Sequence, residues 1–423
     1  MAPSTLKNIS NLGDYYVDNR KPPTAAEWFR LYQKFTNNFY VGSDEVVLWD
    51  NATSVVVFLT DTTRFNREDT RLLLAWTVLR NLVVYTSAVA MKRLQEAPVE
   101  DFCMKTVSGV LDAAVTSRYV STYTPRRVFQ AATTLALNMI KALQYKMTHT
   151  PWIVPPVQNV TLKKARSMRL VMGYPKHLEN TTELEKFYAT FPDAGPGFVT
   201  PYLEMHRHLT SQTFSNNETE NFTTGHANAF YSAGQNSMTI LGGIVQPPMY
   251  FPDGTAALNY GGLGQVIGHE IMHAYDIDGI TYDDTAHSVK FGNTSTMREY
   301  ERKVLCLRSS YEAAERRARQ LSEATDSEGF ADYSGIQLAY AAYRSLPERD
   351  ATLPDVNLSA EQTFFVAHCL KWCDLIKKRK PGGRYWPGRS RCIVPLQNMP
   401  EFARAFGCKA GDLMNPSKRC DFW

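Results

Sequence analysis

Apolar side chains recur every three or four positions over long stretches of the first half of the chain, which is the spacing of one face of an α-helix. This pattern predicts helices over residues 67–92, 101–120 and 124–147. Residues 152–161 are rich in Pro, Val and Ile and predict a loop, which leads into a further helix over residues 162–172. The first half of the chain is therefore expected to be mainly α.

The pattern changes beyond residue 191, where prolines and glycines cluster between positions 192 and 197 and polar residues follow. Such punctuation marks a boundary between domains. A chain of 423 residues is also longer than a single hydrophobic core usually accommodates. We therefore predict an N-terminal helical domain over residues 1–191 and a second domain over residues 192–423.

Two short runs, residues 227–232 and 238–245, have the composition of β-strands. They predict a small β-ribbon. An edge strand can hydrogen-bond to the backbone of a peptide whatever the side chains of that peptide are. This ribbon is therefore a candidate binding site for an extended peptide. A buried ribbon that binds no ligand fits the same pattern.

Residues 261–279 predict a buried helix, because apolar residues keep helical spacing and Glu270 is the only charged residue between positions 266 and 275. His269, Glu270 and His273 form the motif H-E-x-x-H. Residues four apart share one face of a helix, so the two imidazoles point at one ion and Glu270 lies beside it as a candidate general base. The alternative is a chance match with two core histidines bonded to the backbone.

A zinc ion usually takes three protein ligands and a water, so a third ligand must come from elsewhere. The best candidate is Glu328, on a helix that Asp326 or Ser327 would cap. Asp332 then lies one turn further on the same face, where it can orient a ligand histidine. Asp276, one turn beyond the second histidine, is another candidate for that role. A plain surface charge is the alternative for either aspartate.

Composition and charge narrow the class of protein. Hydrophobic residues make up 44% of the chain and charged residues 21%, which is typical of a globular protein and not of a disordered or fibrous one. The net charge of +4 is too small to indicate a nucleic-acid partner. We expect none.

Two features indicate an oxidising, extracellular location. Most of the seven cysteines lie between Cys369 and Cys420 without paired C-x-x-C spacing, which predicts a disulfide-stapled C-terminal region. Asn-x-Ser/Thr acceptor sites for glycosylation are frequent, at Asn8, Asn51, Asn159, Asn180, Asn217, Asn221, Asn293 and Asn357. The sequence has no apolar run of signal-peptide or membrane-spanning length. We therefore expect it to be the C-terminal part of a longer secreted or membrane-anchored protein.

The chain resembles the neprilysin and endothelin-converting-enzyme family of zinc metallopeptidases, strongly over residues 192–423 and more weakly over 24–190. The shared motifs are NAFY at 228–231, QPPMY at 246–250, LNYGGLG at 258–264, VIGHEIMHAYD at 266–276, E-x-x-x-D at 328–332, WC at 372–373, PG-x-x-R at 387–391, LQN at 396–398 and MNP-x-x-x-C-x-x-W at 414–423. The resemblance implies a mainly α fold. It would contain a thermolysin-like (gluzincin) catalytic domain with a small β-ribbon, and part of a helical domain that roofs the active-site cavity.

The resemblance also implies roles for individual residues. One Zn²⁺ ion would be held by His269, His273 and Glu328, with Glu270 as the general base that activates water for peptide hydrolysis. The remaining implied roles are contacts to the substrate backbone at Asn228 and Ala229, orientation of the histidines by Asp276 and Asp332, and a contact to a substrate carbonyl at Arg391.

The family also has a characteristic set of cysteines. It retains a pair that matches Cys306 and Cys420. Cysteines that match Cys103, Cys373 and Cys408 pair in the family with partners upstream of this chain. Cys369 and Cys392 have no counterpart and are left as candidates to bridge each other.

The chain departs from the family at the oxyanion-stabilising histidine, whose position, two residues before Pro387, is here Tyr385. Losing one oxyanion donor costs about 10²–10³-fold in turnover, although a tyrosine hydroxyl can also donate. Tyr333-Ser334 also replaces the family's Asn-Gly. The leading interpretation is a zinc-dependent metalloendopeptidase acting on extracellular peptides. The alternatives are a catalytically impaired, zinc-containing homologue that captures peptides, and a truncated fragment.

Overall fold

A computed structural model describes residues 67–94, 98–123, 126–173, 180–193, 195–215, 226–285, 287–289, 292–315, 323–373 and 384–423, with a few short pieces before residue 67. The chain divides into two compact units, the first formed by residues 1–117 and 176–223 and the second by residues 118–175 and 224–423. This division differs from the boundary predicted near residue 192. The reason is that residues 118–175 pack with the C-terminal half of the chain rather than with the helices that precede them.

The first unit is mainly helical. The predicted helix over residues 67–92 is broken in two, and at the break the ring of Tyr85 packs against Phe102, Phe198 and Tyr202, with centroids 4.8–5.4 Å apart. The predicted helix over residues 101–120 is present as α6, within which the boundary between the units falls. The described elements are β1 (Ser4–Thr5), β2 (Val46–Val47), α4 (Arg67–Leu82), a 3₁₀ turn (Val83–Tyr85), α5 (Ala88–Leu94), α6 (Val99–Tyr123), α9 (Thr181–Tyr188) and α10 (Val199–Ser215).

The second unit contains a three-stranded sheet in the order β3-β5-β4. Strand β5 (Ser237–Leu241) pairs in parallel with β3 (Arg169–Gly173) and antiparallel with β4 (Ala229–Ser232). The predicted helix over residues 162–172 is therefore confirmed only as far as Ser167, and the loop predicted over residues 152–161 was wrong from Pro155 onward. Helix α8 (Pro155–Ser167) begins earlier, with proline in its first turn, and the residues that follow it form β3 because β5 offers them a partner.

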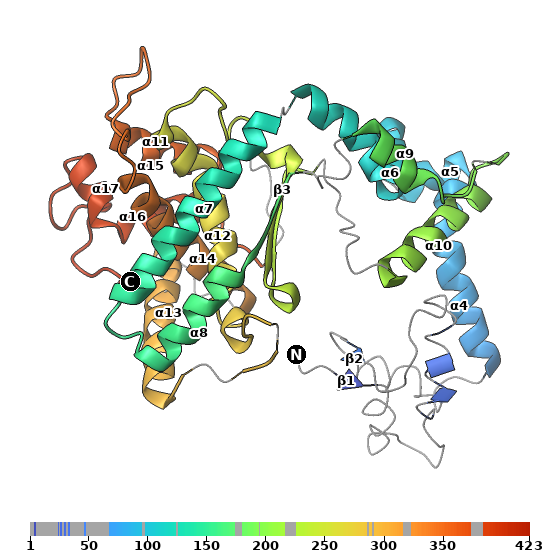
Figure 1. The fold of residues 1–423 in the computed structure, drawn as a ribbon, viewed down its shortest axis with the longest axis horizontal. Helices are drawn as coiled ribbons and strands as arrows, with labels where there is room; N and C mark the ends of the chain where they lie inside the picture. Colours follow the sequence, from blue (N-terminus) through green and yellow to red (C-terminus); the bar gives the residue numbers. More distant parts are fainter. Residues whose placement is uncertain are drawn as a thin grey trace. The chain divides into compact units, whose positions relative to one another are not determined.

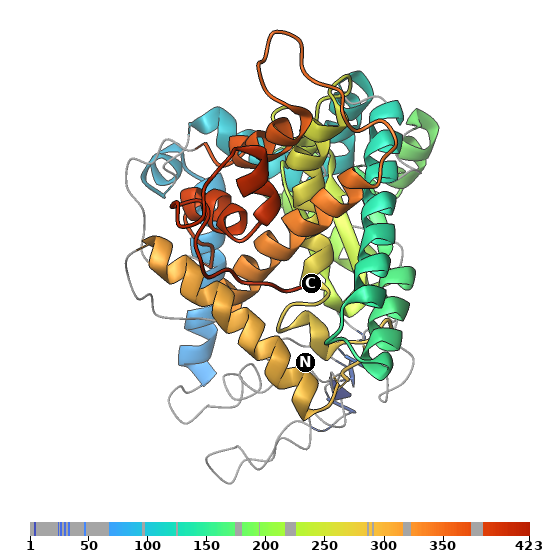
Figure 2. The same ribbon diagram turned by 90° about the vertical axis from the view of Figure 1, so that its left-hand side faces the viewer.

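Helices α7 (Arg126–His149), α12 (Gln265–His273) and α14 (Glu323–Arg344) form the core of the second unit, with α7 and α8 side by side (Figures 1 and 2). Fully buried side chains on these helices include Met139 and Leu143 on α7, Ile271 on α12 and Ile336 on α14. The remaining helices of this unit are α11 (Ala256–Asn259), α13 (Thr294–Glu315), α15 (Ala360–Leu370), α16 (Gly388–Gln397) and α17 (Pro400–Ala405).

Two glycines allow α12 and α14 to pack backbone against backbone. A Cβ atom added to Gly268 would lie 2.4 Å from the carbonyl oxygen of Gly335, and one added to Gly335 would lie 2.6 Å from the backbone nitrogen of His269. Real Cβ atoms do not approach so closely. The close crossing brings the first turns of α14 beside the histidines of α12.

Both helices differ in extent from the prediction. Helix α12 follows a π-helical turn at Tyr260–Gly264 and ends at His273, before the predicted stop at Gly279. Helix α14 begins at Glu323, so Asp326 and Ser327 lie within it and do not cap it. Their side chains have other partners, because Asp326 pairs with Arg308 on α13 and Ser327 donates to Asp276.

The C-terminal segment is tied to this core. Disulfides join Cys306 to Cys420 and Cys369 to Cys392. Tyr333, at the position where the family has asparagine, is buried and donates a hydrogen bond of 2.6 Å to the carbonyl oxygen of Cys420. Helix α14 continues without interruption through this residue. Among the described residues, no helix combines the length and the apolar character needed to cross a membrane.

Candidate metal centre

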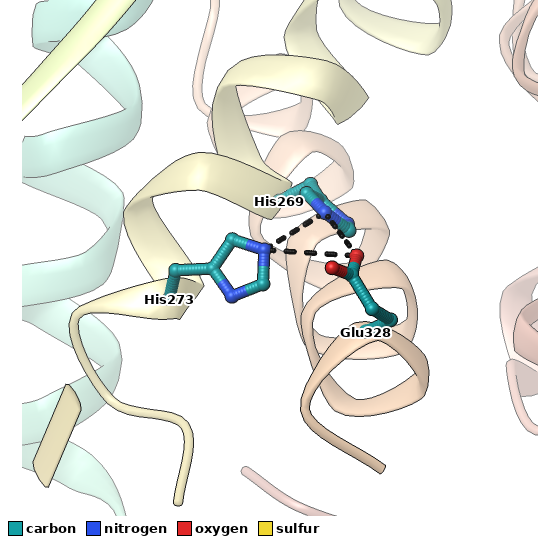
Figure 3. Close-up of side chains that lie close together, drawn as sticks. All are labelled: His269, His273 and Glu328. Carbon is teal, nitrogen blue, oxygen red and sulfur yellow. Dashed lines mark hydrogen bonds and ion pairs between the residues drawn. The ribbon is translucent and has the colours of Figure 1, made fainter. Parts of the chain in front are cut away.

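His269 and His273 project from the last turn and a half of α12 toward Glu328 on α14 (Figure 3). The Nε2 atoms of the two imidazoles are 3.0 Å apart. One carboxylate oxygen of Glu328, Oε2, lies 3.2 Å from Nε2 of His269 and 3.8 Å from that of His273. The three ligand atoms lie within 4.8 Å of one another. The structure thus brings together the three residues predicted to bind zinc.

Two aspartates orient the imidazoles. Nδ1 of His273 lies 2.7 Å from Oδ2 of Asp276, and Nδ1 of His269 lies 2.9 Å from Oδ1 of Asp332. A neutral imidazole that places its proton on Nδ1 leaves a lone pair on Nε2. The carboxylates therefore favour the tautomers in which both Nε2 lone pairs face the same point.

This arrangement fits a cation. Two lone pairs 3.0 Å apart repel each other unless a proton or a metal ion lies between them, and the buried Oε2 of Glu328 lies 3.2 Å from one of the two nitrogens. Two imidazole nitrogens and one carboxylate oxygen are the donor set of catalytic zinc sites, which keep a fourth position open for water. The residues present therefore fit the zinc ion that the sequence predicts.

The electrostatic field at the site also favours positive charge. Burial lowers the pKa of His269, but hydrogen bonding to Asp332 and Glu328 outweighs burial and raises that pKa to about 9. Burial raises the pKa of Asp332, but the opposing effects of Arg391 and His269 are larger. The pKa of Asp332 therefore lies below its ordinary value. Burial also raises the pKa of Glu270, although the neighbouring histidines oppose this shift.

The histidines open onto a cavity of about 350 Å³. Glu270 lines it, as do the predicted backbone-binding residues Asn228 and Ala229 at the start of β4. Tyr385, the residue at the position of the family's oxyanion histidine, also lines this cavity and is 47% exposed. The predicted general base, the predicted peptide-binding strand and Tyr385 therefore line the same cavity as the two histidines.

Arg391 is placed differently from these residues. Its Nε and Nη2 atoms donate to the two carboxylate oxygens of Asp332 at 2.6 and 2.8 Å, and it does not line the cavity. Its guanidinium group lies over the ring of Trp372. A contact from Arg391 to a substrate carbonyl stays a prediction.

Two residues of the site escaped the sequence analysis. Nη2 of Arg384 lies 2.6 Å from Oε1 of Glu328, and the Ser327 hydroxyl donates to Oδ2 of Asp276. No spacing rule relates Arg384 to a helix 56 residues earlier, since it lies in an irregular segment. The sequence indicates Ser327 only as a candidate helix cap. Its position next to Glu328 is the feature that could have indicated a place in the metal site.

A buried H-E-x-x-H helix with a glutamate from a later helix is the metal centre of zinc-dependent peptidases. Comparison with known proteins identifies the group. Two family models match the chain, one over residues 9–175 and the other over residues 228–422, and both are described as "Peptidase family M13". The chain belongs to peptidase family M13, the family of the neprilysins and endothelin-converting enzymes.

Curated relatives agree with this assignment. The chain is 30% identical to neprilysin-1 of Caenorhabditis elegans over 354 residues, which are 78% of this chain and 47% of the relative. It is 28% identical to neprilysin-2 of the same organism over 340 residues, 76% of this chain and 46% of the relative. For human endothelin-converting enzyme 1 the identity is 26% over 377 residues, 81% of this chain and 49% of the relative. The chain spans about half the length of the curated relatives it matches.

Solved structures show the same fold. The zinc metalloprotease Zmp1 of Mycobacterium tuberculosis superposes with a TM-score of 0.72 at 19% identity, covering 93% of this chain and 65% of that one. PepO of Lactobacillus rhamnosis superposes with a TM-score of 0.75 at 19% identity, covering 98% and 65%. The mainly α, thermolysin-like fold expected from the sequence is confirmed.

Proposed function

We propose that this chain is a zinc-dependent metalloendopeptidase that hydrolyses extracellular peptides. The observation that carries this proposal is the convergence of His269, His273 and Glu328 beside Glu270 in a cavity bordered by strand β4. Such a convergence serves no evident structural purpose, because burying a carboxylate and two imidazoles against one another costs free energy unless a ligand compensates for it.

In this proposal His269, His273 and Glu328 hold one zinc ion, and Asp276 and Asp332 keep the imidazoles in the required tautomer. Zinc, when bound, supplies Lewis-acid polarisation of a carbonyl group and makes water more acidic. Glu270 takes a proton from the attacking water and delivers it to the leaving amine.

The substrate is positioned by the remaining residues that line the cavity. Strand β4 forms an edge of the described sheet, so a peptide can extend along it, with its backbone held by Asn228 and Ala229. In this proposal the hydroxyl of Tyr385 donates a hydrogen bond to the developing oxyanion. A tyrosine hydroxyl carries its proton at neutral pH, and burial raises the pKa of Tyr385 further.

The disulfides and the glycosylation sequons support an extracellular location. Disulfides persist in oxidising compartments. Four of the sequons lie in described residues, and the asparagine of each is exposed; these are Asn159, Asn180, Asn293 and Asn357. The other four sequons, at Asn8, Asn51, Asn217 and Asn221, lie outside the described residues. The proposal covers both a secreted enzyme and the ectodomain of a membrane protein.

The test combines zinc content with hydrolysis of a short peptide that has a hydrophobic residue after the scissile bond. We expect about one zinc per chain, cleavage that stops when a chelator removes the metal, and recovery on zinc addition. Glu270→Gln should keep its zinc and lose turnover by about 10²–10⁴-fold, as expected for a general base. Parent-like cleavage by Glu270→Gln would show that the mechanism is wrong.

A second candidate function is motivated by Tyr385. A protein that retains the zinc and the peptide groove but lacks the family's histidine would capture peptides rather than cleave them. Full zinc occupancy with measurable peptide affinity and no cleavage would favour this alternative over the enzyme.

A further inference from the structure

Two arginines near the C-terminus each engage a different carboxylate on α14. Arg391 pairs with Asp332 through two nitrogens, and Arg384 pairs with Glu328 through one. The ring of Tyr385 is common to both arginines, because its centre lies 5.4 Å from the guanidinium carbon of Arg384 and 4.8 Å from that of Arg391. These distances are in the range of cation–π interactions.

The two carboxylate oxygens of Glu328 have different partners. Oε2 faces the Nε2 atoms of the histidines, whereas Oε1 lies 2.6 Å from the guanidinium of Arg384. The Glu328 side chain is 1% exposed and that of Arg384 is 59% exposed. Arg384 therefore approaches from the solvent side of the cavity, and it is the only lysine or arginine among the described residues that line this cavity.

We propose that Arg384 is a positioning residue for the metal ligand: by holding Oε1 of Glu328, and with the ring of Tyr385 as its support, it leaves Oε2 alone to face the zinc. A carboxylate without such a partner can rotate or offer both oxygens. Groups that bind the outer side of metal ligands typically change metal affinity by 10–100-fold when they are removed. This proposal rests on the proposed zinc function and adds a residue to it.

Whether removal of Arg384 weakens or strengthens zinc binding distinguishes a positioning role from simple charge repulsion. A guanidinium close to a dication also repels it, and repulsion alone would make removal of Arg384 strengthen zinc binding. Positioning predicts the opposite, because loss of the partner leaves the buried Oε1 unpaired. A lysine at the same place keeps a cation for Oε1 and should preserve most of the effect.

The experiment measures zinc affinity of the full chain by competition with a chromophoric chelator. Arg384→Leu should weaken affinity by about tenfold or more, and Arg384→Lys should stay within about threefold of the parent. Arg389→Leu is the matched control, since it removes the same charge from an exposed position on α16, and should leave affinity unchanged. Equal or tighter binding by Arg384→Leu would overturn the proposal. A parent chain that binds no zinc would instead overturn the proposed function.

A second readout reports the geometry directly. The absorption spectrum of the cobalt(II)-substituted protein should change in Arg384→Leu and not in Arg389→Leu. Tyr385→Phe keeps the aromatic ring and should match the parent in zinc affinity, whereas Tyr385→Leu should weaken it. Equal weakening by both Tyr385 variants would overturn the supporting role of the ring. These variants, with Arg384→Lys, decide the question even if Arg384→Leu does not fold.

Discussion

Asp332 joins Arg391 to His269. Its two carboxylate oxygens accept hydrogen bonds of 2.6 and 2.8 Å from the guanidinium group, and Oδ1 also lies 2.9 Å from Nδ1 of the imidazole. The Asp332 side chain is fully buried, and that of Arg391 is 12% exposed. A single buried carboxylate therefore links α16 to α14 and to the histidine face of α12.

The first prediction concerns this buried pair. Arg391→Met should destabilise the protein by about 3–5 kcal/mol, because it leaves the charge of Asp332 buried without its main partner. Urea unfolding measures this cost. The double variant with Asp332→Asn should recover part of it, since the uncompensated charge is then gone. A cost below about 1 kcal/mol for the single variant would show that the pair is not structurally important.

The second prediction concerns the crossing of α12 and α14. Gly335→Ala should cost about 1–3 kcal/mol or more, because the added Cβ would meet the backbone of His269 at 2.6 Å. The same strain should move His269 away from Glu328 and weaken zinc binding. Gly234→Ala is the control, as a Cβ there meets no atom within 4 Å. A Gly335→Ala variant with parent-like stability and zinc affinity would contradict this account of the crossing.

Much of the metal centre could be predicted because its spacing is local. His269 and His273 share a helix face, as do Glu328 and Asp332, and Asp276 reaches back to His273 over three residues. Arg384 could not be predicted, since its contact with Glu328 depends on how a distant segment folds. Strand β3 was missed for the same reason, because its partner β5 lies more than 60 residues later and local periodicity does not record that pairing.

The third prediction uses the pH dependence of stability. Burial lowers the pKa of Lys371 to about 7, against the attraction of Asp332, whereas lysine in an unfolded chain titrates near 10.4. Below pH 7 both states are protonated, and the folded state bears the full cost of a buried charge. Between about pH 7 and 10 the unfolded state binds the extra proton, so the contribution of Lys371 to the free energy of unfolding rises with pH.

Lys371→Met should therefore be more stable than the parent at pH 6, and this advantage should shrink by pH 10. Urea midpoints of both proteins at pH 6, 8 and 10 measure it. Lys141→Met, at an exposed position on α7, is the control for loss of one positive charge and of a lysine side chain. An advantage of Lys371→Met that stays constant or grows toward pH 10 would contradict the assigned sign.

The fourth prediction separates the hydroxyl of Tyr385 from its ring. If the hydroxyl donates to the oxyanion, Tyr385→Phe should lower kcat by about 10²–10³-fold while KM and zinc stoichiometry hold, because the lost interaction exists only in the transition state. Steady-state kinetics on the short peptide, with zinc content measured on the same samples, gives these values. Tyr385→His should raise kcat above that of the parent, since an imidazole is the family's donor at this position. If Tyr385→Phe turns over like the parent, the hydroxyl has no part in the reaction, and the tyrosine acts only through the ring that lies against Arg384 and Arg391.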